Sequence, residues 1–177
     1  MERFEVRRGV AKSLGGNAGL EKLATKYFEQ VSAGIDGGFN ASFGILTNIT
    51  ANYSDDGKLV VDVKQMKGQE LQSLLDSDDG REKAMASRTR WSSFLDAATG
   101  YDAKKRGDKA KEAAKKVSKA KGNIRQAQKF MSMSSSLDEQ TLEQAADLIM
   151  QVEKKLEEGN GTRALSLSKQ LNKLIEG

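Results

Sequence analysis

The sequence predicts an α+β fold: an N-terminal antiparallel sheet covered by helices, followed by an all-helical C-terminal hairpin region. Residues 39–64 alternate between apolar and polar side chains, which is typical of half-buried strands. After residue 80, apolar residues recur every three or four positions, which is typical of amphipathic helices. We therefore expect an α+β domain over 1–100, a basic helical hairpin over 101–135 and a C-terminal helical hairpin over 136–177.

The first elements are predicted to be a strand and a helix. Residues 3–7 alternate, with Phe4 and Val6 on one side, so they indicate a short strand. A glycine-rich stretch then leads into a helix expected over 17–33. Its apolar stripe has spacings of three and four and consists of Leu20, Leu23, Tyr27 and Val31.

The clearest strand pattern runs from Phe39 to Tyr53. Apolar residues or Thr occupy its odd positions, and Leu46 is the one large apolar exception at an even position. Asp55–Gly57 then predicts a hairpin turn into a second strand over 58–64. Because one register persists so long, we expect one sheet face to be buried beneath helices and the other to be wet.

Two helices are expected after the strands. The first covers about 69–75 and the second about 79–98. The second places Trp91, the only tryptophan, on an inward stripe with Phe94 and Leu95. Gly100 follows as a helix C-terminal residue that can adopt a positive φ.

The segment from Phe94 to Arg106, with the opening Phe4–Gly9, resembles a family of small archaeal proteins of unknown function. In that family an F-L-x-x-A-T-G-Y-x-A-K-x-R segment closes a compact α+β domain, and this chain matches each fixed position of the segment. The resemblance covers about the first 110 residues. It implies an α+β fold and an archaeal, cytosolic origin, and it brings no activity.

The C-terminal tail is predicted to consist of helices. From Ala103 to Val117 the expected inward stripe is nearly all Ala and Gly, and Gly122-Asn123 is expected to break this helix. Ser136 and Glu139 match a capping box, so a helix should begin at Leu137. Leucine-rich stripes follow over 142–156 and 165–175.

A faint 37-residue repeat links the Gly-Asn pair at 122 to the pair at 159. The tail is weakly similar to the helical hairpins of tetratricopeptide-like arrays, although their aromatic positions are missing. Chance is the rival interpretation. Two units are fewer than such arrays need, so we expect the hairpins to pack on each other, on the first domain or on a second subunit.

Composition excludes most simple catalytic chemistries. The chain has no cysteine and no histidine, so it lacks thiolate nucleophiles, His general bases and zinc sites built on Cys or His. The glycines at 15–19 lack the Lys-Ser/Thr of a phosphate-binding loop, and the loop beginning at Asp76 has Ser87 where a calcium loop needs Glu. We expect a non-enzyme with no cofactor and no metal. No run approaches the roughly 18 apolar residues of a membrane helix, so we expect a cytoplasmic location.

Positive charge is concentrated in one segment. Residues 81–129 hold fifteen Lys or Arg and five Asp or Glu, a net charge of +10, so the rest of the chain sums to −6. One hypothesis is that a Lys-rich helix contacts nucleic acid or another polyanion through phosphates; a solvated face is the alternative. The candidate contact residues are Arg88, Arg90, Lys104, Lys105, Arg106, Lys109, Lys111, Lys115, Lys116 and Lys119.

A second hypothesis assigns the tail to protein partners. The stripes over 142–156 and 165–175 would then serve protein–protein interaction or self-assembly. No bulky apolar face accompanies the lysines, so we do not expect membrane binding.

Overall fold

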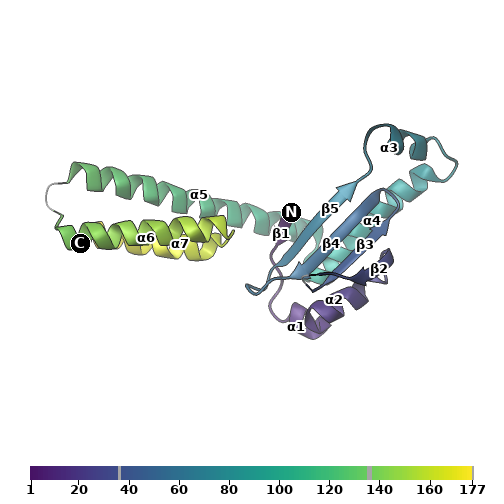
Figure 1. Ribbon diagram of the computed structural model, residues 1–177, viewed down its shortest axis with the longest axis horizontal. Coiled ribbons are helices and arrows are strands. Elements are labelled where there is room, and N and C mark those ends of the chain that lie inside the picture. Colours follow the sequence, from purple (N-terminus) through teal and green to yellow (C-terminus); the bar gives the residue numbers. More distant parts are fainter. Residues whose placement is uncertain (36, 135–136, 177) are drawn as a thin grey trace. The chain divides into compact units, whose positions relative to one another are not determined.

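The computed structural model describes residues 1–35, 37–134 and 137–176. It forms two compact units, unit 1 (Met1–Lys109) and unit 2 (Ala110–Gly177). Unit 1 is an α+β domain, as predicted, and unit 2 is helical (Figure 1). The long helix α5 (Ala103–Met133) begins in unit 1 and continues into unit 2.

Unit 1 is built on a five-stranded antiparallel sheet with strand order β1-β5-β4-β3-β2. The strands are β1 (Glu2–Phe4), β2 (Glu29–Ala33), β3 (Phe39–Phe43), β4 (Leu46–Tyr53) and β5 (Leu59–Gln65). The helices are α1 (Val10–Leu14), α2 (Gly16–Ala24), α3 (Gly68–Leu75) and α4 (Gly80–Thr99), followed by the start of α5. The predicted β4–β5 hairpin and the helices matching α3 and α4 are therefore confirmed.

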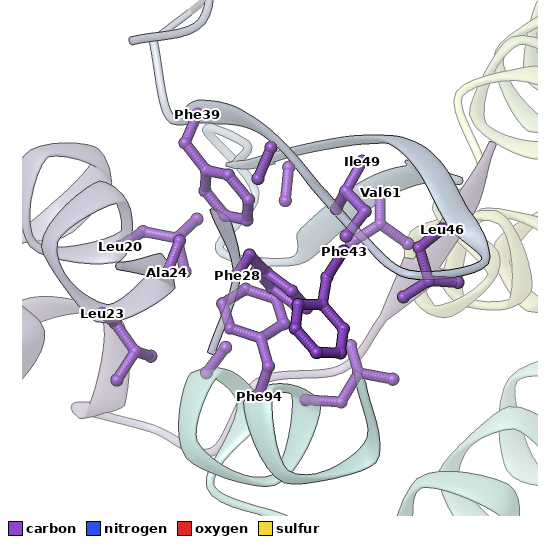
Figure 2. Packing of buried hydrophobic residues seen from close by; sticks show 14 of the residues in the cluster. Leu20, Leu23, Ala24, Phe28, Phe39, Phe43, Leu46, Ile49, Val61 and Phe94 are labelled. Carbon is purple, nitrogen blue, oxygen red and sulfur yellow. The ribbon is translucent and has the colours of Figure 1, made fainter. Parts of the chain in front are cut away.

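The core of unit 1 lies between one face of the sheet and the helices α2 and α4. Three phenylalanine rings meet there: the Phe94 centroid is 5.1 Å from that of Phe28 and 5.4 Å from that of Phe39. Figure 2 shows these rings beside Leu20 and Ala24 of α2. The half-buried Trp91 stacks on Phe94 at 5.7 Å, which confirms its inward position on α4.

Two sequence predictions in unit 1 were wrong. The helix expected over 17–33 ends at Ala24, and Val31 belongs to strand β2. The spacing of four between Tyr27 and Val31 is compatible with one face of a helix and with one face of a strand. Pairing with β3 decides for the strand, because it supplies backbone hydrogen bonds for residues 29–33. Edge-strand pairing therefore outweighed the apparent helical period.

The single strand expected over 39–53 is a hairpin of β3 and β4. Gly44 turns the chain with φ +53°, and a Cβ there would clash with Ser87 Oγ. The buried Ser87 hydroxyl accepts a hydrogen bond from the Ile45 amide at 3.1 Å, which holds the turn against α4. Odd positions are buried in β3 and again from Ile49 onward in β4, and the register irregularity between Leu46 and Asn48 lets Leu46 be buried as well, which explains why it broke the pattern.

Unit 2 consists of three helices that run alongside one another: α5, α6 (Glu139–Glu157) and α7 (Gly161–Glu176) (Figure 1). Buried residues from all three form two adjoining clusters. The larger side chains in these clusters are Ile124, Val152, Leu167, Leu171 and Ile175. The leucine-rich stripes of α6 and α7 thus pack within unit 2.

Three details of the tail differ from the sequence predictions. Helix α5 is continuous through Gly122-Asn123, where the buried Ala120 and Ile124 pack on either side of the pair. This packing offsets the roughly 1 kcal/mol helix penalty of glycine. Because Gly159 alone lies in a turn, the two halves of the proposed repeat are not structurally equivalent. The stripe of small residues expected to face inward does not do so, because Ala103, Gly107, Ala110 and Ala114 are exposed.

The start of α6 also differs from the prediction. Ser136, the predicted cap, lies outside the described residues. The helix begins at Glu139, and the side chain of Asp138 caps it by accepting a hydrogen bond from the Thr141 amide at 2.7 Å. An N-cap two residues later than expected fulfils the same role.

Candidate nucleic-acid interface

Helix α5 has opposite faces of different character within unit 2. Its inward stripe contains Ala120, Ile124 and Ala127, all buried. Lys111, Lys115 and Lys119 follow one another at intervals of four on the other side, and all three are exposed. Residues four apart lie on one helix face, so these ammonium groups form a ridge. We call Lys111, Lys115 and Lys119 the lysine ridge.

The structure separates the predicted contact residues between the two units. Lys111, Lys115, Lys116 and Lys119 belong to unit 2, whereas the remaining candidates belong to unit 1. Lys116 is half-buried, and its Nζ donates to Thr162 Oγ1 of α7 at 3.2 Å. Lys116 therefore helps to join α5 to α7 and takes part in the fold as well as in the charge of the helix.

The candidates in unit 1 have varied surroundings. Arg88, Lys104 and Lys105 are exposed, and Lys109 is half-buried. The Arg90 guanidinium carbon lies 3.9 Å from the centroid of the Phe43 ring, and Nη1 donates to the Tyr27 carbonyl at 3.3 Å. Arg90 thus stabilises the edge of the aromatic core.

Arg106 is the one buried member of the candidate set. Its guanidinium forms an ion pair with Asp96 and donates to the Tyr101 carbonyl at 2.7 Å. The arginine side chain is only 7% exposed, and it connects the end of α4 to the first turns of α5. These contacts assign Arg106 to the structure of unit 1, and we leave it out of the proposed contact surface.

A compact corner surrounds this arginine. The buried Thr99 Oγ1 donates to the Leu95 carbonyl at 2.6 Å and accepts from the Tyr101 amide at 3.2 Å. Gly100 ends α4 with φ +71°, and a Cβ there would lie 2.7 Å from Val10 Cγ2. The position therefore favours glycine on both conformational and steric grounds.

Tyr53 fixes the same corner to the sheet. Its hydroxyl donates to the Ala98 carbonyl at 2.7 Å. Burial raises the pKa of Tyr53 to about 12, so the hydroxyl keeps its proton at neutral pH. Residues 94–106 therefore form a structural joint between α4, α5 and the sheet.

A second basic feature of unit 2 escaped the sequence analysis. A groove between α5 and α7 is lined by Lys119, Asn123, Lys169, Asn172, Lys173 and Glu176. Lys169 and Lys173 are four residues apart on α7, and this spacing was the available signal. We call this feature the α5/α7 groove.

Residues 1–112 match a protein family described as a domain of unknown function, DUF5611. The chain belongs to this family. No curated protein and no solved structure matches the chain.

The DUF5611 match coincides closely with the structural division of the chain. It covers all of unit 1, including the corner at Gly100 and Arg106, and it ends in α5 at residue 112. The family domain therefore includes the sheet, the aromatic core and the joint that closes them. The lysine ridge from Lys115 onward, and the entire α5/α7 groove, lie beyond the matched residues.

Several carboxylates of the DUF5611 domain form ion pairs, among them those of Glu5, Asp56 and Asp96. Burial on its own would raise the pKa of Asp56, but the Ser54 hydroxyl and the charges of Arg3 and Lys58 lower it below its ordinary value. Within residues 1–35, 37–134 and 137–176, no three Asp or Glu side chains cluster as a metal site would require. No helix in this described part of the chain is long and apolar enough to cross a membrane.

Proposed function

We propose that this protein is a non-enzymatic binding protein whose helix α5 contacts nucleic acid, or another polyanion, through phosphate groups. The observation that carries the proposal is the lysine ridge on α5 in unit 2. From Ala110 to Met133 this helix has seven Lys or Arg and one acid, Glu112. The proposal includes an archaeal, cytoplasmic setting, which rests on the sequence resemblance.

The side-chain types favour the phosphate backbone over the bases as the contact. Lysine offers a mobile point charge to a phosphate without reading its neighbours. Unit 2 has one aromatic residue, Phe130, whereas proteins that hold single strands stack several bases on aromatic rings. We therefore expect binding that is indifferent to base sequence and sensitive to salt.

The alternative, a protein-interaction module built on the α6 and α7 stripes, receives less support. Ala145, Val152 and Leu171 are fully buried within unit 2, where α5 also contributes to the same clusters. A free apolar face on those stripes would require the helices to separate. Self-association that Leu171→Asp abolishes while the bundle remains folded would restore this alternative.

The test is a titration of the full chain against a labelled 20-base-pair DNA duplex and a structured RNA at several salt concentrations. We expect log affinity to fall linearly with log salt, with a slope of roughly −0.9 per phosphate contacted on DNA. Charge reversal by Lys111→Glu and Lys115→Glu should weaken binding at least tenfold. The control with the same change in charge, Lys64→Glu with Lys67→Glu at two exposed lysines of unit 1, should change affinity less than twofold.

Competition identifies the class of polyanion. Unlabelled duplex should displace the labelled duplex at lower phosphate concentration than inorganic polyphosphate does if nucleic acid is the partner. Displacement at a lower phosphate concentration by polyphosphate than by duplex would identify a polyanion other than nucleic acid as the partner. No binding to either at low salt would contradict the proposed function and leave the lysines as a solvated face.

A further inference from the structure

The α5/α7 groove gathers positive charge from two helices. Lys119 contributes from α5, and Lys169 and Lys173 contribute from α7. All three lysines are exposed, and none forms an ion pair with any residue in the described part of the chain. Glu176 is the one acid on the lining, so the groove has a net charge of +2. A groove of this composition attracts an anion.

The groove also has a polar floor inside an otherwise aliphatic bundle. Asn123 Nδ2 donates to Ser168 Oγ at 3.0 Å, and that hydroxyl donates to the Leu165 carbonyl at 3.0 Å. Asn172 Oδ1 is buried and has no hydrogen-bond partner among the described residues. An unpaired buried acceptor costs stability, and leucine would avoid that cost at such a position. The Asn172 oxygen is an acceptor and does not itself bind a phosphate oxygen; the donors that the groove offers to a phosphate are its lysine ammonium groups and the amide Nδ2 atoms of its asparagines.

We propose that the α5/α7 groove binds a phosphate group, so that the α7 lysines extend the contact surface beyond the lysine ridge. This inference rests on the proposed function and adds a second helix to it. Lys119 belongs to both features, because it ends the ridge and lines the groove. Three ammonium groups around one depression can donate charge-assisted hydrogen bonds to the oxygens of one phosphate.

The groove makes phosphate binding depend on the fold of unit 2. Lys119 and Lys169 are fifty positions apart in the chain and meet only because α5 and α7 pack together. The contacts of Asn123 with Ser168 and of Lys116 with Thr162 hold the two helices in this register. A phosphate in the groove would bridge the same two helices and should therefore stabilise unit 2.

The experiment compares three double variants of the full chain in the duplex titration. Lys169→Glu with Lys173→Glu tests the groove, and Lys111→Glu with Lys115→Glu tests the ridge. Lys64→Glu with Lys67→Glu, at two exposed lysines of unit 1, is the control with the same change in charge. We expect the groove variant to weaken binding at least tenfold and to reduce the salt slope by about 2, which is about 1 for each lysine that no longer binds a phosphate. The control should stay within twofold of the unchanged protein.

The outcomes separate the inference from the proposed function. If the groove variant matches the control while the ridge variant loses affinity, the inference is overturned and the proposed function stands. If all three variants match the unchanged protein, both are overturned. Far-ultraviolet circular dichroism checks folding, and Lys169→Gln with Lys173→Gln takes the place of the groove variant if charge reversal unfolds the bundle.

A small probe locates the site directly. Titration with inorganic tripolyphosphate should shift the side-chain amide resonances of Asn123 and Asn172 in a nitrogen–proton NMR spectrum. The shifts should disappear in the Lys169→Gln and Lys173→Gln variant, while circular dichroism shows the helices intact. Shifts confined to the lysine ridge would contradict a phosphate site in the groove.

Discussion

Unit 1 and unit 2 achieve a folded core by different means. Nine of the ten aromatic residues belong to unit 1, where Phe28, Phe39 and Phe94 contact one another edge to face or stacked. Unit 2 has Phe130 alone, and four of its nine buried apolar residues are alanines. The aromatic core buries far more area per residue. We therefore expect unit 1 to be the more stable of the two, whereas unit 2 has the larger net positive charge.

The largest expected effect is a cavity at the centre of unit 1. Phe94→Ala should lower the free energy of unfolding by about 3–5 kcal/mol, because the ring is fully buried among other rings. Urea unfolding followed by Trp91 fluorescence measures it, since the two rings stack. Met85→Ala, on the same helix at a side chain that is 71% exposed, is the control and should change stability little.

The matching cavity in unit 2 should have a somewhat smaller effect. Leu171 is fully buried, and Leu171→Ala should cost about 2–4 kcal/mol. Loss of helical circular dichroism at a lower urea concentration is the expected result, with the 61% exposed Met150→Ala as control. A loss no larger than that of Met150→Ala would contradict the buried position of Leu171 in the three-helix core.

Arg106→Ala should lower the stability of unit 1 without lowering the affinity for duplex DNA. Removing the guanidinium leaves the Tyr101 carbonyl and the Asp96 carboxylate without their donor, so we expect a loss of about 1–3 kcal/mol. Duplex affinity should stay within twofold, because the side chain is buried. The exposed Lys105→Ala should leave stability unchanged, and a loss of affinity specific to Arg106→Ala would return this residue to the contact surface.

Asn172→Leu, unlike the three substitutions above, should raise the free energy of unfolding. It removes the unpaired buried acceptor, so unit 2 should gain about 1 kcal/mol in the free energy of unfolding. Affinity for tripolyphosphate should fall at the same time if the groove binds phosphate. A destabilised variant would show that Asn172 has a structural role, and unchanged phosphate affinity would count against the groove.

The contrast between the units also explains what the sequence could predict. Alternation identified β4 and β5, and helical spacing identified α4, α6 and α7, because each of these elements buries one face. The errors fell where tertiary contacts decided between local options. Val31 lies in a strand because β2 pairs with β3, and the turn at Gly44 is stabilised by the hydrogen bond between the Ile45 amide and Ser87 of α4. No local pattern encodes either partner.

The candidate site shows the same division between local and non-local information. Lys111, Lys115 and Lys119 could be placed on one helix face by their spacing of four. Arg106 looked like their neighbour in sequence, yet its pairing with Asp96 depends on how the corner at Gly100 folds back. Lys169 and Lys173 could not be joined to Lys119 until α5 and α7 were seen to pack together.

The smallest expected effect is a pH dependence at the start of α6. The hydrogen bond from the Thr141 amide lowers the pKa of Asp138, and the helix dipole acts in the same direction. A carboxyl whose pKa is lower in the folded state stabilises the fold above its unfolded value of about 3.9. That contribution is lost as the pH falls through the folded pKa. Asp138→Asn keeps an acceptor for the Thr141 amide but cannot titrate.

Melting curves of the unchanged protein and Asp138→Asn at several pH values separate these effects. The unchanged protein should be slightly more stable at neutral pH, and its advantage should disappear under acid conditions. Other carboxylates with lowered pKa, such as Asp56, titrate in both proteins and cancel in the difference. Because the cap belongs to unit 2, the difference should appear in its helical signal and not in Trp91 fluorescence. A constant difference at every pH would show that the charge of Asp138 adds nothing to the cap.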